Sequence, residues 1–114
     1  MANDTSKQAA GPGILDELFA VIEQRRDADP ESSWTARLFA RGTPKIAQKV
    51  GEEATETVIA ALAESDDALA NESADLIYHL LVLWAARGIT PAQVYAVLAG
   101  RRGKRGIRED ETPE

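Results

Sequence analysis

Two groups of acidic residues are the features of this sequence best suited to chemistry. The first is Glu52-Glu53-x-x-Glu56, and the second is Glu72-x-x-Asp75. In each group, a spacing of three residues places carboxylates on one face of a helix. Carboxylates gathered from two neighbouring helices repel one another unless a cation lies between them, and hard divalent cations prefer oxygen ligands. Because Mg²⁺ held in this way commonly works on phosphate groups, the pattern predicts a helical, metal-dependent enzyme of phosphate chemistry.

The second acidic group distinguishes a metal site from an ordinary solvated helix face, which is the simpler interpretation of the first group alone. Glu72, Asp75 and His79 share an arc with apolar residues such as Leu76 and Val82. An unpartnered carboxylate is costly to bury there, so a cation is expected beside it. The all-carboxylate set favours Mg²⁺ or Mn²⁺, whereas a di-iron centre would need Glu-x-x-His pairs and the sequence has one histidine. That histidine is expected to hydrogen-bond Asp75 or a substrate, with simple packing as the alternative.

Helix start and stop signals predict an all-α antiparallel bundle of about five helices, and strand signals are nearly absent. The expected helices cover about residues 14–26, 33–39, 43–64, 66–87 and 91–100. Ser33 (or Ser32), Thr43 and Ser65 are expected N-caps, Gly88 is an expected helix stop, and Thr90 begins a capping box. The short connection around residue 65 makes the two acidic helices antiparallel neighbours.

The helix that carries the first acidic group is expected to be amphipathic. Its predicted apolar stripe consists of Ile46, Val50, Ala54, Thr57, Val58, Ala61 and Leu62, and its predicted charged arc consists of Lys45, Lys49, Glu52, Glu53 and Glu56. Lys49 has two compatible interpretations. It forms an i,i+4 ion pair with Glu53, or it lies, together with Lys45, where a phosphate chain would leave the metal.

Length and composition predict a single domain of 114 residues, with a flexible arm at 1–13, a helical domain at 14–102 and a charged tail at 103–114. The net charge of −6 argues against a nucleic-acid surface, although residues 101–108 hold five basic side chains that are either solvated or turned toward phosphate. The apolar run 76–86 is too short to cross a membrane. The polar start and the lack of cysteine predict a cytoplasmic protein. Because that run is apolar on nearly every side, it also predicts a homodimer.

Three strings in the sequence resemble a known family. They are Ser33-Trp34-Thr35-Ala36-Arg37-Leu38, then Lys45-Ile46-Ala47-Gln48-Lys49-Val50-Gly51-Glu52-Glu53-Ala54-x-Glu56, then Glu72-Ser73-Ala74-Asp75-Leu76-x-Tyr78-His79-Leu80. EExxE followed by ExxD is similar to the wider all-α NTP pyrophosphatase (MazG-like) superfamily. The K-V-G-E-E-A and E-S-A-D-L-x-Y-H-L strings more specifically resemble the phosphoribosyl-ATP pyrophosphohydrolase family, over about residues 14–102.

The resemblance implies Mg-dependent hydrolysis of phosphoribosyl-ATP, a nucleotide, to phosphoribosyl-AMP and pyrophosphate in histidine biosynthesis. It implies metal ligands at Glu53, Glu56, Glu72 and Asp75, catalytic roles for Glu52, Glu53 and Glu56, and substrate contacts from Lys45, Lys49, Arg37 and His79. Whether Glu52 is the base or supports the ligands stays open. Two other functions also stay open: a housecleaning NTP pyrophosphatase of the same superfamily, and a non-catalytic helical dimer that binds a structural cation.

Overall fold

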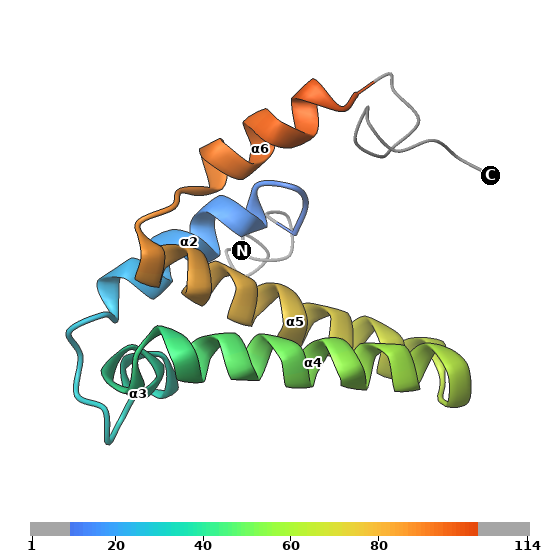
Figure 1. Ribbon diagram of the computed structural model, residues 1–114, viewed down its shortest axis with the longest axis horizontal. Helices are drawn as coiled ribbons and strands as arrows, with labels where there is room; N and C mark the ends of the chain where they lie inside the picture. Colours follow the sequence, from blue (N-terminus) through green and yellow to red (C-terminus); the bar gives the residue numbers. More distant parts are fainter. Residues whose placement is uncertain (1–9, 103–114) are drawn as a thin grey trace, which may run out of the picture.

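The computed structural model describes residues 10–102, which form five α-helices and no strand. They are α2 (Ile14–Gln24), α3 (Trp34–Arg41), α4 (Thr43–Ala63), α5 (Asp66–Arg87) and α6 (Pro91–Gly100). Figure 1 shows α4 and α5 side by side as a long hairpin, with α3 across one end of it and α2 against α5. The expected all-α fold is therefore confirmed. Most of the expected arm (1–9) and all of the expected tail (103–114) lie outside the described residues.

Side-chain caps fix where three of the helices begin. Ser33, Ser65 and Thr90 each accept a hydrogen bond from a backbone N–H in the first turn of α3, α5 and α6. Gly88 ends α5 in the left-handed conformation, with a φ of 75°. The prediction for Thr43 is wrong, because the preceding glycine, with a φ of 90°, occupies the cap position and Thr43 is already helical. The other helix ends lie within two residues of those expected.

The apolar core lies at one end of the hairpin, where α2 and α3 meet α4 and α5. Its buried members are Ile22, Leu38, Ile46, Leu81, Val82 and Ala85. Arg26, just after α2, donates through both Nη atoms to the backbone carbonyl of Ala85, at 3.2 and 3.0 Å. Its guanidinium carbon lies 4.6 Å from the centroid of the Phe39 ring. The end of α2 is therefore tied to the end of α5 and to α3.

The buried face of α4 differs from the predicted apolar stripe. Ile46, Glu53 and Ala60 are its buried residues, and they follow one another at intervals of seven. Seven residues at about 100° each return almost to the starting direction, so Glu53 shares a face with Ile46. Val58 and Leu62, which were expected to be buried, are 56% and 83% exposed. The second half of the predicted stripe is therefore wrong, and an acidic side chain takes the place of an apolar one against α5.

The last helix leaves the hairpin at a sharp angle. α5 and α6 are bent by 110° relative to each other, and only as this bent pair do they reach the length and hydropathy of a membrane span, which no single helix within residues 10–102 does. The Tyr95 hydroxyl donates to the Asp16 carboxylate at 3.0 Å and so joins α6 to α2. Val97 and Leu98 on α6 remain exposed.

Candidate active site

Three of the predicted carboxylates meet between α4 and α5. Glu53, Glu56 and Glu72 each place an oxygen within 4.8 Å of the others. Two come from one turn of α4, and the third comes from α5 because the short connection after α4 folds the second helix back alongside the first. We call this group the carboxylate cluster.

The carboxylate cluster is electrostatically unsatisfied. Burial raises the pKa of Glu53, and the neighbouring Glu56 carboxylate adds to the rise. Burial also raises the pKa of Glu72, with the nearby Glu56 carboxyl as the next cause. Glu53 Oε1 and Glu72 Oε1 are buried without a hydrogen-bond partner. Both unpaired atoms are acceptors, so a species that brings positive charge fits between them.

The remaining two predicted acids have different surroundings. Glu52 is exposed, and its carboxylate accepts hydrogen bonds from Gln48 Nε2 at 2.8 Å and from Lys49 Nζ at 3.3 Å. These hydrogen bonds lower the pKa of Glu52 and keep its carboxylate ionised. Asp75 is also exposed and lies outside the carboxylate cluster, although its charge contributes to the raised pKa of Glu53 and Glu72.

His79 is buried on α5, with only 6% of its surface exposed. Its Nδ1 lies 2.8 Å from the backbone carbonyl of Asp75, so Nδ1 donates the hydrogen bond and Nε2 is left for another partner. That Nε2 atom is buried without a partner. The ring is held edge-on by Tyr78, whose hydroxyl is hydrogen-bonded to Thr35 on α3. The start of α3 therefore supports the histidine from the side.

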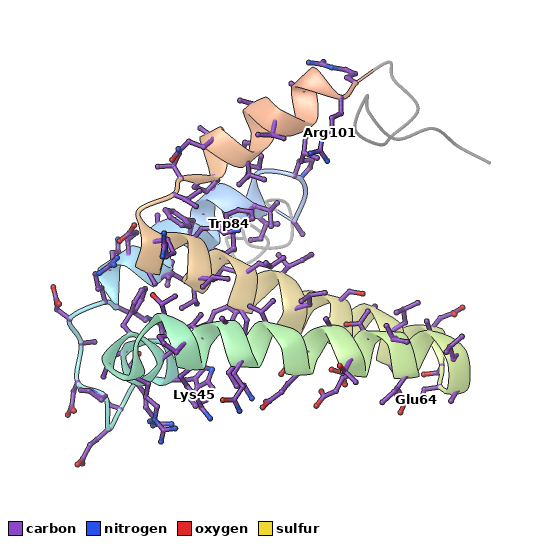
Figure 2. All side chains as sticks on the ribbon, in the orientation of Figure 1. Lys45, Glu64, Trp84 and Arg101 are labelled. Carbon is purple, nitrogen blue, oxygen red and sulfur yellow. The ribbon has the colours of Figure 1, made fainter. Side chains whose placement is uncertain are left out.

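Two of the predicted cations, Lys49 and Arg37, lie over the Trp34 ring, and Lys49 also lies beside the carboxylate cluster. Lys49 Nζ lies 3.9 Å from Glu53 Oε2 and 5.8 Å from the centroid of the indole. Arg37 lies with its guanidinium carbon 5.4 Å from the same ring, and its Nε donates to a loop carbonyl at 3.2 Å. Lys45 is one turn farther toward the start of α4 (Figure 2), and its charge contributes to the lowered pKa of Glu52.

The role of Trp34 was missed in the sequence, where this residue appears only within a family string. Its contacts reach α4 and α5, and no periodicity within a single helix reports such contacts. The basic residues of the C-terminal stretch are less informative. Of these, Arg101 and Arg102 alone are described, and both are exposed. Figure 2 shows Arg101 at the far end of α6, away from Lys45 on α4.

A pocket of about 420 Å³ lies outside this site. It is lined by residues of the α2–α3 loop, α3 and the start of α4, including Arg26, Phe39 and Thr43, and by none of the predicted site residues. Arg26 is already engaged by the Ala85 carbonyl and by Glu23, at 3.1 Å. The pocket therefore offers no free charge to a ligand through this arginine.

Comparison with known proteins identifies the family. The model of the phosphoribosyl-ATP pyrophosphohydrolase family matches residues 15–102. The chain belongs to this family. The phosphoribosyl-ATP pyrophosphatase of Paramagnetospirillum magneticum is 60% identical over 99 residues, which are 87% of this chain and 91% of the relative. The enzyme of the same name from Azospirillum brasilense is 59% identical over 84% of this chain and 86% of the relative. The one from Rhodospirillum rubrum is 57% identical over 87% of this chain and 85% of the relative.

Membership of the phosphoribosyl-ATP pyrophosphohydrolase family confirms the resemblance found in the sequence. The matched range contains both acidic groups and, apart from the first residue of α2, every described helix. The donor set of the carboxylate cluster consists of carboxylate oxygens, which fits a hard divalent cation. For this member of the family, the described structure thus unites three of the four predicted ligands and sets Asp75 beside them.

Proposed function

We propose that this protein hydrolyses phosphoribosyl-ATP to phosphoribosyl-AMP and pyrophosphate, the second step of histidine biosynthesis. One observation carries the proposal: Glu53, Glu56 and Glu72 converge within a chain whose residues 15–102 match the pyrophosphohydrolase family. Cleavage of a phosphoanhydride depends on positioning and charge neutralisation more than on covalent chemistry. A carboxylate site with cations beside it supplies both.

The proposed cofactor is Mg²⁺, with Mn²⁺ as the alternative, held by Glu53, Glu56, Glu72 and Asp75. The two buried, unpaired carboxylate oxygens support this assignment, because a divalent cation would pair both of them. When bound, the ion would neutralise phosphate oxygens and lower the pKa of the attacking water. Asp75, one turn after Glu72 on α5, is the ligand whose side chain must move most to join.

The surrounding residues are assigned the roles of base, charge neutralisation and substrate contact. Glu52 is the candidate base, because it lies outside the proposed ligand set and next to the ligand Glu53, with which it shares Lys49. Lys49, with Lys45 and Arg37, would balance the charge of the leaving pyrophosphate. His79 would accept a hydrogen bond from the bound substrate through Nε2, the atom that the protein itself leaves unpaired.

The test of this function is release of pyrophosphate when purified protein is incubated with phosphoribosyl-ATP and Mg²⁺. Glu64→Gln, at the far end of α4 from Lys45 (Figure 2), is the control that should retain full activity. A panel of ordinary NTPs is run in parallel. Release of pyrophosphate from NTPs but not from phosphoribosyl-ATP would indicate a housecleaning pyrophosphatase. Metal-dependent melting without any release would indicate a structural cation site.

A homodimer is part of the proposal. Val58, Ile59 and Leu62 on α4 and Ile77 on α5 are exposed large apolar side chains, and a second copy of the chain would cover them. Sedimentation at micromolar concentration should give twice the mass of the 12.3 kDa chain. Leu62→Glu should shift the protein toward monomer, whereas Asn71→Glu at an exposed polar position should not. A monomeric wild-type protein would contradict the proposed dimer.

Location and domain limits complete the proposal. We infer a cytoplasmic enzyme, which cell fractionation would check. We also infer that residues 14–102 form one folding unit, which agrees with the family match over 15–102. Limited proteolysis should leave a fragment close to these limits, and early cleavage within α4 or α5 would contradict them.

A further inference from the structure

We propose that Trp34 is the platform on which the adenine base of the substrate stacks. This inference rests on the proposed function, because it takes the ligand to be an adenine nucleotide whose phosphates lie at the carboxylate cluster. Nucleobases stack readily on tryptophan and other aromatic side chains, whatever the base. The platform needs an exposed indole, at a fixed position, within a nucleotide's reach of the carboxylates.

Exposure singles out Trp34 among the aromatic residues. It is 42% exposed, and every other aromatic side chain within residues 10–102 is buried or half-buried. Trp84, by contrast, packs against the apolar core. Trp34 is nevertheless the first residue of α3, a helix that is fixed by the Ser33 cap and by the hydrogen bond between Thr35 and Tyr78. An exposed ring that is already fixed in place loses little conformational entropy when a ligand stacks on it.

Position links the indole to the carboxylate cluster through Lys49. The lysine Nζ is 5.8 Å from the indole centroid and 3.9 Å from Glu53 Oε2, so the ring and the carboxylate are separated by no more than these two distances added together. His79 lies on the same side, with its ring centroid 6.4 Å from that of Trp34. A base on the indole would therefore direct its phosphates toward Lys49 and the carboxylates.

The two cations near the ring would have to move aside for a stacked base, and their contacts with the ring are long. Arg26 stacks on Phe39 at 4.6 Å, whereas Arg37 and Lys49 lie 5.4 and 5.8 Å from the Trp34 centroid. Both distances fall toward the outer limit of about 6 Å for a cation–π contact. The competing interpretation is that Trp34 only holds these cations in place. The two interpretations differ in what they predict for pyrophosphate, which has phosphates but no base.

The first experiment follows the fluorescence of Trp34 in full-length protein. Trp84→Phe leaves Trp34 as the sole tryptophan, and Trp34→Phe leaves Trp84 as the matched control. AMP with Mg²⁺ should quench the first protein and not the second, and pyrophosphate should quench neither. If Trp84→Phe fails to fold, the difference between wild type and Trp34→Phe gives the same signal. Emission that responds to protein concentration but not to AMP would overturn the platform and indicate a contact between subunits.

The second experiment compares two inhibitors of turnover. Trp34→Leu should weaken inhibition by AMP on the order of tenfold and leave inhibition by pyrophosphate unchanged, and Trp34→Phe should restore most of the AMP effect. An equal loss for both inhibitors would show that Trp34 acts only through Lys49 and Arg37. Quenching by AMP without hydrolysis of phosphoribosyl-ATP would reject the proposed function and keep the platform. Hydrolysis of phosphoribosyl-ATP together with unchanged inhibition by AMP in Trp34→Leu would support the proposed function and reject the platform.

Discussion

The two parts of the α4–α5 hairpin are stabilised in different ways. At the end covered by α2 and α3, apolar residues such as Ile46, Leu81 and Val82 are fully buried by the chain itself. Farther along, the same two helices meet through Glu53 and Glu72, each with a buried oxygen that has no partner. The first part is completed by folding. In the second part, buried carboxylate oxygens remain unpaired in the folded chain, as is expected of a ligand-binding site.

The contrast extends to the exposed side of the hairpin. Val58 and Leu62 follow the acidic residues along α4, and both remain exposed within the part of the chain that the structure describes. Packing in the core is therefore expected to set stability, whereas charge in the proposed site is expected to set activity. Substitutions in the two parts should separate these effects.

The largest effect is expected from neutralising one carboxylate. Glu56→Gln should reduce hydrolysis of phosphoribosyl-ATP by at least about 10²-fold, because it removes the negative charge of a proposed metal ligand but keeps the size of the side chain. Asp75→Asn should do the same if that residue joins the ligands. Circular dichroism should remain helical, and the melting temperature should stay the same or rise as repulsion is relieved. Near wild-type turnover at ordinary Mg²⁺ would remove the altered residue from the ligand set.

The next effect should appear in stability. Leu81→Ala opens a cavity among fully buried side chains and should lower the free energy of unfolding by about 2–5 kcal/mol. Leu62→Ala, at a position 83% exposed, should change it by less than about 0.5 kcal/mol when measured on the monomer. Chemical denaturation at low protein concentration measures both. A similar loss of stability in the two variants would show that the two parts of the hairpin do not differ in how far the chain itself buries their apolar residues.

A smaller effect is expected at the edge of the carboxylate cluster. Lys49→Ala should reduce kcat/KM by an amount worth about 1.5–3 kcal/mol, the range for a hydrogen bond to a charged group. The Mg²⁺ concentration for half activity should move less than in Glu56→Gln. Lys45→Ala, one turn farther away, is the comparison and should lose less. Unchanged kinetics in Lys49→Ala would make that lysine an ordinary surface partner of Glu52 and Glu53.

The smallest effect concerns pH without metal. The pKa of Glu53 is raised in the folded state, so the unfolded chain releases this proton first, near 4.5. Stability in EDTA should therefore fall as the pH rises from about 4.5 through the folded-state pKa, and then level off. Glu53→Gln should reduce this dependence and leave a remainder from Glu72, whose pKa is also raised, and Mg²⁺ should reduce it as well. Melting curves across this pH range test it, and a rise in stability over the same interval would contradict the assignment.

The sequence predicted the parts of this structure that depend on local signals. The caps at Ser33, Ser65 and Thr90 and the stop at Gly88 depend on a few neighbouring residues, and they were found where expected. The meeting of the two acidic groups followed from the short connection between their helices. The cluster needed only this topology and the correct helix face.

What the sequence did not predict depends on which surfaces touch. Val58 looked like a core residue because it is apolar, yet it is 56% exposed in the described structure. Burial of Glu53 instead depends on how α4 is rotated about its own axis where it packs against α5. A helical wheel shows which residues share a face but not which face meets the neighbouring helix. Trp34 was missed because its partners, Lys49 and His79, belong to other helices. A spacing of one turn from Glu72 did not bring Asp75 into the cluster, because spacing along one helix does not determine the distance to the other helix.

The contact between Arg26 and the Ala85 carbonyl has a consequence for the order of events during synthesis. The two residues are 59 positions apart, so the arginine leaves the ribosome long before its acceptor has been made. α2 is thus translated before the other described helices, but it gains its contacts to α5 only when nearly the whole described chain has emerged. A nascent chain arrested before residue 85 should hold α2 loosely, and one arrested well beyond it should protect α2 from protease. Of the helices that the structure describes, the one translated first therefore depends for its contacts on residues that are translated late.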